Sequence, residues 1–354
     1  MSGAAAGPLR VGILGATGTV GQRFIQLLEH HPQFRVTALA ASDRSQGKPY
    51  REACVWRLPG PMPPEAAELP VEPPRPPLPC DVIFSSLPAD HARDVEGAFV
   101  RAGYPVISNS SSYRMDPDVP LIIPEVNPEH LGLLDGRTSP GYVVTNPNCS
   151  TITLTLALAP LQAQFGVEAV VATTLQAISG AGYPGVAALD ITDNVLPFIA
   201  HEEEKIERET PKLLGRFEGG RIIPGALAVS AQCHRVNVVD GHLVAVRVKL
   251  ASSPEPAAIA EVMACFSGVP QRLHLPSAPE RPIIVRPEPD RPQPRLDRDA
   301  GGGMSVTVGR IARDRVLGYR FVVLGHNTIR GAAGAALLNA ELLLAQGRLR
   351  RAAT

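Results

Sequence analysis

The stretch LRVGILGATGTVGQRFIQLLEHH, residues 9–31, decides the fold class. Its apolar start, residues 9–14, predicts a short buried strand. After the glycines, Val20, Phe24 and Leu27 recur at helical spacing, which predicts an amphipathic helix. A strand that runs through a glycine-rich turn into a helix is the opening unit of a dinucleotide-binding domain.

The turn has the spacing Gly15-x-x-Gly18-x-x-Gly21 rather than the commoner GxGxxG. Glycines let the backbone turn tightly and approach a pyrophosphate, whose charge is favoured at a helix N-terminus. A glycine trio can also be a purely structural turn, but the strand–turn–helix context favours a cofactor site. The expected contacts are Gly15, Thr17, Gly18, Thr19, Val20 and Gly21.

Strand and helix patterns continue to alternate along the first part of the chain. Further strands are predicted at 34–42, 81–88, 105–111 and 141–146, with a helix at 89–102. This alternation predicts an α/β fold with a Rossmann-type, doubly wound parallel sheet. The proline-rich span 58–79 is expected to be an irregular surface segment, and a second proline- and arginine-rich span covers 275–299.

The end of the second predicted strand bears on the choice of cofactor. An acidic residue there would bind the ribose 2′-hydroxyl of NAD and repel the 2′-phosphate of NADP. Ser42, Arg44 and Ser45 can instead donate hydrogen bonds to a phosphate, which favours NADP. Asp43 leaves NAD open if its carboxylate points into the site.

The second part of the chain has a different pattern. A helix is predicted at about 150–164 and a strand in the run that starts at residue 167, followed by a charged helix at 201–215. Residues 231–250 hold two β-branched runs around Asp240-Gly241, which predicts a hairpin. These elements predict a second, α+β unit.

Cys149 is the candidate nucleophile. Asn148 is a favourable N-cap, so Cys149 falls in the first turn of the predicted helix, where partial positive charge is expected to lower the thiol pKa. The same amides could stabilise an oxyanion on a substrate carbonyl. A buried, inert cysteine is the alternative interpretation.

A thiol nucleophile needs a proton partner, and histidine is the natural one. His242 opens a strand and could equally be a core histidine. In the predicted hairpin, Arg235 shares the face of His242, so the two could flank a small anionic substrate.

Composition limits the functional classes. The 354 residues carry a formal net charge of zero, so no overall field attracts nucleic acid or an anionic membrane. The five cysteines show no metal-binding spacing, and a metal site is not expected. Without a signal peptide or a long apolar segment, the protein is expected to be soluble and cytoplasmic.

Eight motifs closely resemble aspartate-semialdehyde dehydrogenase of the archaeal and fungal type, over almost the whole chain. In order they are GATGTVGQRF, AASDRSQGK, NSSSYRM, NPNCSTI, QAISGAG, EEEKIERETPKLL, HRVNVVDGH and GHNTIRGAA. The resemblance implies NADP-dependent reductive dephosphorylation of L-4-aspartyl phosphate to L-aspartate 4-semialdehyde, or the reverse, in the biosynthesis of lysine, threonine and methionine.

The resemblance also implies roles for individual residues. Cys149 would be the nucleophile, His242 the general acid/base and Gln176 the residue that orients the substrate, with Asn148 accompanying the cysteine. Arg235 would hold the substrate carboxylate and Glu202 its amino group. Lys205 and Arg114 would bind phosphate. Asn327 takes the place of a nicotinamide-contacting amide, often Gln in relatives.

The family's architecture implies a division into two domains, 1–148 plus 325–354 for NADP and 149–324 for catalysis and dimerisation, in a homodimer or homotetramer. Malonyl-CoA reductase is the nearest enzymatic alternative, and N-acetylglutamyl-phosphate reductase matches the motifs less well. A catalytically silent NADP-binding regulator is the alternative from another class. The combination of Cys149, Gln176, Arg235 and His242 argues against it.

Overall fold

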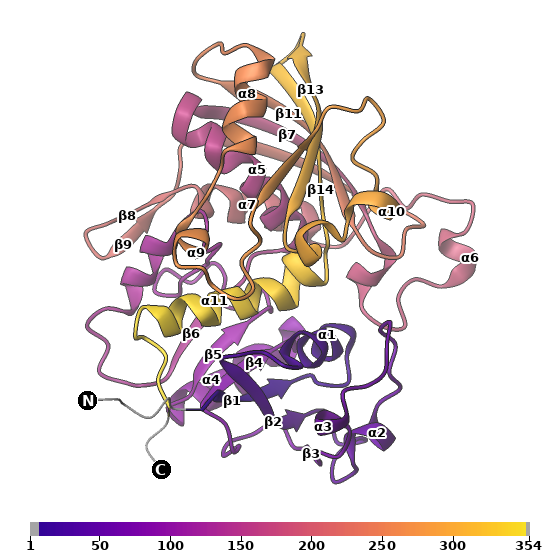
Figure 1. The fold of residues 1–354 in the computed structure, drawn as a ribbon, viewed down its shortest axis with the longest axis vertical. Helices are drawn as coiled ribbons and strands as arrows, with labels where there is room; N and C mark the ends of the chain where they lie inside the picture. The colour runs from indigo at the N-terminus through magenta and orange to yellow at the C-terminus, as the bar shows by residue number, and fades with distance from the viewer. Residues whose placement is uncertain (1–6, 352–354) are drawn as a thin grey trace.

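The computed structural model describes residues 7–351 and contains two large sheets, one above the other in Figure 1. The first sheet is entirely parallel, in the order β3-β2-β1-β4-β5-β6. Its strands are β1 (Leu9–Leu14), β2 (Phe34–Ala40), β3 (Val71–Glu72), β4 (Val82–Ser85), β5 (Pro105–Ser108) and β6 (Tyr142–Thr145). The predicted doubly wound parallel sheet is confirmed.

The strand order of this sheet reverses direction between β1 and β4. Loops that leave the carboxyl ends of these two strands diverge to opposite sides, and the crevice between them is where such folds bind ligands. The glycine turn follows β1 and leads into α1 (Thr19–Leu28), while α4 (Ala89–Arg101) follows β4. A Cβ atom on Gly15 would lie 3.0 Å from Oγ of Ser86, so the two loops meet closely.

The proline-rich span 58–79 is less irregular than expected. It contains the short helix α3 (Pro64–Ala67) and the edge strand β3, and it follows α2 (Tyr50–Ala53). Val71 is buried against the first sheet because β3 pairs with β2. The span therefore extends the sheet by one strand.

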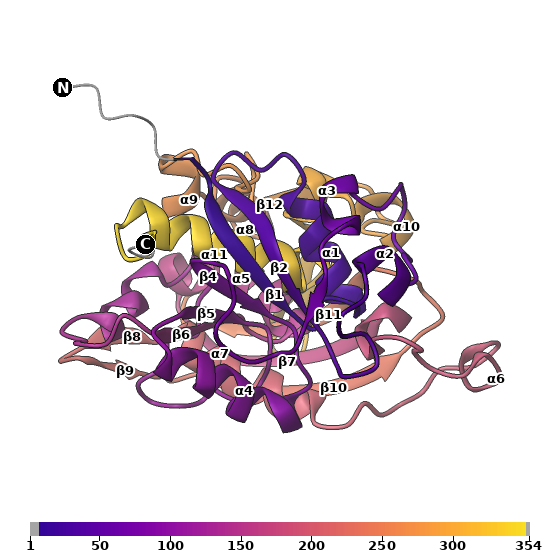
Figure 2. The same cartoon turned by 90° about the horizontal axis from the view of Figure 1, so that it is seen from below.

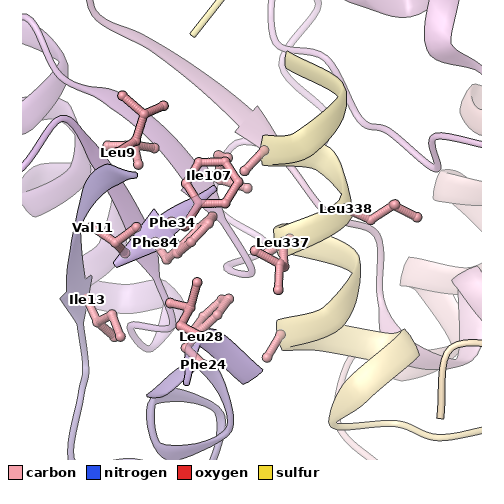
Figure 3. Close-up of a cluster of buried hydrophobic side chains, with 14 of the residues drawn as sticks. Leu9, Val11, Ile13, Phe24, Leu28, Phe34, Phe84, Ile107, Leu337 and Leu338 are labelled. Atoms are coloured by element: carbon pink, nitrogen blue, oxygen red, sulfur yellow. The ribbon is translucent and has the colours of Figure 1, made fainter. Parts of the chain in front are cut away.

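The last helix, α11 (Gly334–Ala345), packs on the first sheet (Figure 3). Leu337 and Leu338 join a buried cluster in which the rings of Phe24 and Phe84 stack at 4.9 Å between centroids. Full burial of each such side chain is worth about 1.5–3 kcal/mol. The exact domain boundaries, and the ends at 1–6 and 352–354 that lie outside the described residues, stay a prediction.

The second sheet is mixed, with the order β10-β7-β11-β14-β13-β12. Its strands are β7 (Val167–Gln176), β10 (Ala228–Arg235), β11 (His242–Leu250), β12 (Ile283–Arg286), β13 (Val306–Asp314) and β14 (Gly318–Gly325). The helices α5 (Cys149–Phe165), α7 (Glu202–Leu213) and α8 (Pro256–Ala264) pack on one face of it. On the other face Val171 and Leu175 are exposed.

The predicted hairpin at 231–250 is wrong. β10 and β11 do not pair with each other, because β7 lies between them, parallel to β10 and antiparallel to β11. The segment that joins them crosses the end of β7, where the N–H groups of Ile178 and Ser179 donate to the carbonyls of Val238 and Val239. The turn signal at Asp240-Gly241 marks this crossing instead of a tight hairpin.

The remaining elements are short. They are the hairpin β8 (Arg216–Glu218) and β9 (Arg221–Ile223), the helices α6 (Ala188–Ile191), α9 (Val269–Arg272) and α10 (Pro294–Asp297), the 3-10 turns η1 (Pro128–Leu134), η2 (Ile178–Ala181) and η3 (Ala300–Gly303), and the π-helix η4 (Ile329–Ala333). Figure 2 shows α6 projecting from the body of the molecule. Within residues 7–351, no helix has the length and apolar character needed to cross a membrane.

Candidate active site

A cleft of about 1140 Å³ runs between the two sheets. It joins the glycine turn to the start of α5, so the candidate cofactor residues and Cys149 share one space. The residues that line it include Gly15, Thr17, Gly18, Thr19, Val20, Ser42, Asp43, Arg114, Asn148, Cys149, Gly180, Glu202, Lys205, Asn327 and Gly331. A single cleft that holds both sets suits a reaction between a cofactor and a thiol-bound substrate.

The glycine turn has a geometry that fits a dinucleotide. Gly15 has a φ of +75°, which favours glycine, and Gly18 is the N-cap of α1. A Cβ on Gly21 would lie 2.3 Å from the carbonyl oxygen of Gly15, so only glycine lets the helix approach the turn. Thr19 and Val20, in the first turn of α1, line the cleft, and the free N–H groups of a helix start would favour a pyrophosphate there.

Two buried side chains that the sequence did not single out support this turn. The hydroxyl of Tyr50 donates to the carbonyl of Ala16 at 2.7 Å, and the amide of Gln22 donates to the carbonyl of Thr17 at 3.2 Å. Both lie outside the three glycines, and each holds one carbonyl of the turn by a hydrogen bond. These contacts support the conformation of the turn.

The residues after β2 divide into two groups. Ser42 and Asp43 line the cleft. Arg44 and Ser45 do not line it, and the exposed guanidinium of Arg44 forms no ion pair with the described residues. An unpaired arginine beside the cleft is available to a 2′-phosphate.

Cys149 is the first residue of α5, as predicted. The side-chain oxygen of Asn148 accepts from the N–H groups of Ser150 at 2.9 Å and Thr151 at 3.1 Å, which makes Asn148 the N-cap. Thr153 donates back to the carbonyl of Cys149 at 2.9 Å. The helix start thus holds the thiol at the wall of the cleft.

The pKa of the Cys149 thiol differs from expectation. Burial and the carboxylate of Glu202 raise the pKa of Cys149 to about 12, although Arg114, Arg235 and Lys205 act in the opposite direction. Burial and Glu202 therefore oppose the effect of the helix start on the thiol. Any ligand that neutralises Glu202 removes part of this barrier.

Gln176, Arg235 and His242 lie at the same end of three neighbouring strands, β7, β10 and β11. Arg235 pairs with Gln176 in the parallel ladder of β10 and β7, and His242 begins β11 on the other side of β7. The two flanking residues do approach each other, by way of strand order and not through the predicted hairpin. A Cβ on Gly180 would lie 2.8 Å from Nη1 of Arg235 and 3.0 Å from Nε2 of His242.

His242 is fully buried and its tautomer follows from its hydrogen bond. Nδ1 accepts from the N–H of Ala177 at 3.0 Å, which leaves the proton of the neutral ring on Nε2. Burial and the nearby Arg235 lower the pKa of His242 to about 3, so the ring is neutral. Nε2 has no partner among the described residues and can donate to a substrate oxygen.

Glu202 connects three of the candidate residues. Its Oε1 accepts from Nζ of Lys205 at 2.8 Å, and its Oε2 accepts from the side-chain amides of Asn148 at 2.8 Å and Gln176 at 3.2 Å. Burial alone would raise the pKa of Glu202, but these three partners hold it below its usual range. The buried carboxylate is therefore ionised and can bind a cation.

Arg114 comes from the loop after β5 and is buried. Its Nη1 donates to Glu209 at 2.9 Å and its Nη2 to the carbonyl of Asn109 at 2.6 Å. Arg114 and Lys205 both line the cleft, so two cations face the same space. The contact with Glu209 was not expected from the sequence.

Asn327 and Gly331 bring the C-terminal motif to the site. The side chain of Asn327 accepts from the N–H of Gly241 at 2.8 Å and donates to Oγ of Ser179 at 2.7 Å while it lines the cleft. A Cβ on Gly331, in η4, would lie 2.6 Å from Cβ of Cys149. Gly331 was not singled out, although its motif was, and it lets η4 press against the cysteine.

Among residues 7–351 no group of three or more His, Cys, Asp or Glu side chains is placed to hold a metal ion. Most of the predicted site residues line the cleft. Gln176 contacts Glu202 of its wall, and Arg235 and His242 lie against Gly180 of its wall, whereas Gly21, Arg44 and Ser45 do not line it. Residues from both sheets and from η4 meet there. The arrangement suits thiol attack on a carbonyl next to a bound dinucleotide.

Family models match both parts of the chain. The model described as semialdehyde dehydrogenase, NAD binding domain, matches residues 10–134, and the model described as semialdehyde dehydrogenase, dimerisation domain, matches residues 158–330. Together they cover most of the chain, and Cys149 lies in the interval between the two matches.

Similar proteins are named consistently. The aspartate-semialdehyde dehydrogenase of Archaeoglobus fulgidus is 54% identical, with 94% of this chain and 97% of the relative covered. That of Methanothermobacter thermautotrophicus is 52% identical over 95% and 99% of the two chains. The crystal structure of the Candida albicans enzyme with NADP superposes with a TM-score of 0.89 at 43% identity, covering 96% of this chain and 99% of that one.

Proposed function

The chain belongs to the aspartate-semialdehyde dehydrogenase family, and we propose that it catalyses the NADP-dependent reductive dephosphorylation of L-4-aspartyl phosphate to L-aspartate 4-semialdehyde, and the reverse. One observation carries the proposal. Cys149 and Glu202 line the same cleft as the glycine turn, Gln176 is hydrogen-bonded to Glu202, and Arg235 and His242 lie against Gly180 of the cleft wall. The enzyme would act in the biosynthesis of lysine, threonine and methionine.

Charged side chains account for substrate binding. Arg235 binds the α-carboxylate and Glu202 the α-ammonium, which pairs with the buried carboxylate and cancels its effect on the thiol. Arg114 and Lys205 bind the phosphate. These contacts place the acyl carbon over Sγ of Cys149, with Gln176 orienting the substrate beside it.

The first chemical step forms a bond between Sγ of Cys149 and the acyl carbon and breaks the bond from that carbon to the phosphate oxygen. The thiol proton ends on the departing phosphate, so atoms and charge balance. Acylation of the cysteine divides one difficult reduction into two easier steps. The product bound to the protein is a thioester.

His242 acts as the donor to the reacting oxygen. Its Nε2–H stabilises the negative charge that develops on the carbonyl oxygen, and the tautomer fixed by Ala177 supports this role. To serve also as a base at Nε2, as the resemblance implies, the ring would have to carry its proton on Nδ1 instead, which gives up the hydrogen bond from the Ala177 N–H. Once the thioester carbon has received a hydride, the carbonyl re-forms, the C–S bond breaks with its electron pair returning to Sγ of Cys149, and the semialdehyde leaves.

The cofactor is proposed to be NADP, which supplies or accepts the hydride when bound. The glycine turn would hold its pyrophosphate, Ser42, Arg44 and Ser45 its 2′-phosphate, and Asn327 would lie next to the nicotinamide. The NADP complex of the similar Candida albicans enzyme supports this choice. Asp43, which lines the cleft, is the reason to measure NAD alongside NADP.

The protein is proposed to be a cytoplasmic homodimer or homotetramer. The match to a dimerisation domain and the open face of the second sheet, with Val171 and Leu175 exposed, support self-association. Sedimentation should give two or four times the chain mass of 37.5 kDa. A monomer at micromolar concentration would contradict this part of the proposal.

One assay tests the activity. The protein is incubated with L-aspartate 4-semialdehyde, phosphate and either NADP or NAD, and the absorbance of the reduced cofactor is followed. Phosphate-dependent reduction of NADP, abolished in Cys149→Ala, is expected. No reduction by the wild-type protein, or reduction that does not need phosphate, would contradict the proposal.

Two alternative functions can be tested with the same purified protein. Malonyl-CoA lacks the amino group, so its turnover without turnover of the amino-acid substrate would indicate a malonyl-CoA reductase. Binding of NADPH without a thiol-dependent burst on any acyl phosphate or thioester would indicate a silent regulator. The similar proteins cited above are aspartate-semialdehyde dehydrogenases, which favours the first proposal.

A further inference from the structure

Helix α7 repeats a Glu-x-x-Lys pair. Glu202 and Lys205 line the cleft, and Glu209 and Lys212 follow seven residues later on the same face of the helix. Glu209 and Lys212 are buried, with exposed fractions of 2% and 5%. A buried second pair one heptad from the first has to satisfy its charges inside the protein.

Glu209 satisfies its charge through two residues of the proposed active site. Oε1 accepts from Nη1 of Arg114 at 2.9 Å, and Oε2 accepts from the backbone N–H of Asn148 at 2.6 Å. One carboxylate therefore joins the proposed phosphate-binding arginine to the residue that precedes Cys149. Glu209 itself does not line the cleft, although Glu202 and Lys205 of the same helix do.

Lys212 holds the backbone of the same loop. Its buried Nζ donates to the carbonyls of Arg114, Asp116 and Val119 at 2.7, 2.9 and 3.1 Å. The second pair of α7 thus fixes Arg114 twice, through the side chain by Glu209 and through the main chain by Lys212. The first pair stays free to face the cleft.

The guanidinium of Arg114 has donors that no protein group uses. Glu209 and Asn109 occupy Nη1 and Nη2, while Nε is buried without a partner among the described residues. Arg114 also lines the cleft. A guanidinium that two hydrogen bonds anchor and whose Nε–H has no protein partner is pre-organised for an anion.

We propose that Glu209 is a positioning residue that sets the distance between the phosphate group of the substrate and the thiol of Cys149. It does so by holding Arg114 and the Asn148 N–H on one rigid carboxylate. The inference rests on the proposed role of Arg114 in phosphate binding. A phosphate held in fixed relation to the nucleophile is presented in line for departure or attack.

The test is the substitution Glu209→Gln, which keeps the shape and can still accept from Asn148, but turns an amide or an uncharged oxygen toward the guanidinium. In the phosphorylating direction the KM for phosphate should rise about tenfold or more, as expected for a lost charge-assisted hydrogen bond. The KM values for L-aspartate 4-semialdehyde and NADP should change less than about twofold. Phosphate should also protect Cys149 less well from alkylation.

The matched control is Glu204→Gln, which makes the same change of charge on the exposed side of α7. It should leave the KM for phosphate unchanged. A merely structural role for Glu209 predicts a uniform loss of activity with all three substrates together with a lower melting temperature. That result, or no change in Glu209→Gln, would overturn the inference.

Arg114→Ala separates this inference from the proposed function. If Arg114→Ala leaves the KM for phosphate unchanged, the role proposed for Arg114 fails. If it raises that KM and Glu209→Gln does not, the inference about Glu209 alone fails. Should Glu209→Gln not fold, Glu209→Asp replaces it, since the shorter carboxylate cannot reach both partners, and an unchanged KM for phosphate there is equally decisive.

Discussion

The cofactor turn and the reaction site solve the problem of placing charge in different ways. The turn after β1 uses backbone N–H groups and the absence of side chains at Gly15 and Gly21. The reaction site uses ionised side chains from distant segments, joined by direct hydrogen bonds through Glu202 and Glu209. The first therefore depends on space for the backbone, and the second on the identity of each partner.

The largest effect is expected for the side chain that reacts. Cys149→Ser should lower kcat by about 10⁴-fold or more, because the hydroxyl is a far weaker nucleophile than the thiol in the same pocket. The phosphate-dependent reduction of NADP measures it. Cys265→Ser, at an exposed cysteine, is the control and should retain full activity. Comparable activity in Cys149→Ser would show that Cys149 is not the nucleophile.

A smaller effect is expected where the turn lacks space. Gly21→Ala places a Cβ 2.3 Å from the carbonyl oxygen of Gly15, whereas Gly18→Ala places it at 3.3 Å. Overpacking of this kind costs about 1–3 kcal/mol. The KM for NADP should rise and the melting temperature fall in Gly21→Ala, with much weaker changes in Gly18→Ala. Equal behaviour of the two variants would contradict a turn defined by close approach.

Substitution of Glu202 should make the Cys149 thiol more reactive and, at the same time, make turnover of the substrate less efficient. Its carboxylate raises the pKa of Cys149, so Glu202→Gln lowers that pKa and increases the thiolate fraction at neutral pH. Alkylation of Cys149 in the absence of substrate should become faster, by about tenfold for each pKa unit gained. At the same time kcat/KM should fall, because the site for the substrate ammonium loses its charge. Slower alkylation would exclude Glu202 as the group that restrains the thiol.

A weaker effect is expected at the cofactor end of the cleft. Arg44→Ser removes an exposed arginine next to Ser42 and Asp43, and the KM for NADP should rise about three- to tenfold. The KM values for NAD and phosphate should not change. The matched control Arg35→Ser removes an arginine at the start of β2, the end of that strand away from Arg44. If NADP and NAD are affected alike, the 2′-phosphate does not contact Arg44.

The smallest effect concerns stability and lies outside both regions. Burial lowers the pKa of His130 to about 4, below its ordinary value of 6.5. The unfolded chain binds a proton below pH 6.5 that the folded chain takes only near pH 4, so stability that is complete above pH 6.5 is lost as the pH falls toward 4. Urea unfolding at pH 7 and pH 5 should differ by at most about 2 kcal/mol from this residue. The difference should shrink in His130→Gln and persist in His30→Gln, an exposed histidine.

Local features of the site were predictable from the sequence. The glycine turn and the Asn148-capped start of α5 each occupy one short segment, and propensity, capping and periodicity describe such segments well. Strand pairing is not local. The runs around Asp240-Gly241 carry a good turn signal, but only the insertion of β7 decides that they do not form a hairpin.

Burial and charge pairing account for the other differences. A helix start predicts a low thiol pKa, yet burial and Glu202 outweigh it. Glu209 and Lys212 have the same 3-residue spacing as any solvated ion pair on a helix surface, so nothing in their pattern reveals that they are buried under Arg114. Gly331 gives no signal apart from its motif, because its role depends on the approach of η4 to Cys149.

The insertion of β7 between β10 and β11 has a consequence for folding. Arg235 and His242 are close in sequence, but no local closure of the chain brings them together, because their neighbour is a strand formed much earlier in the sequence. Such non-local pairing forms slowly and cooperatively. Arg235 and His242 therefore come together only when the second sheet as a whole has formed. A chain in which this sheet is incomplete contains Cys149 but lacks the residues that would act with it.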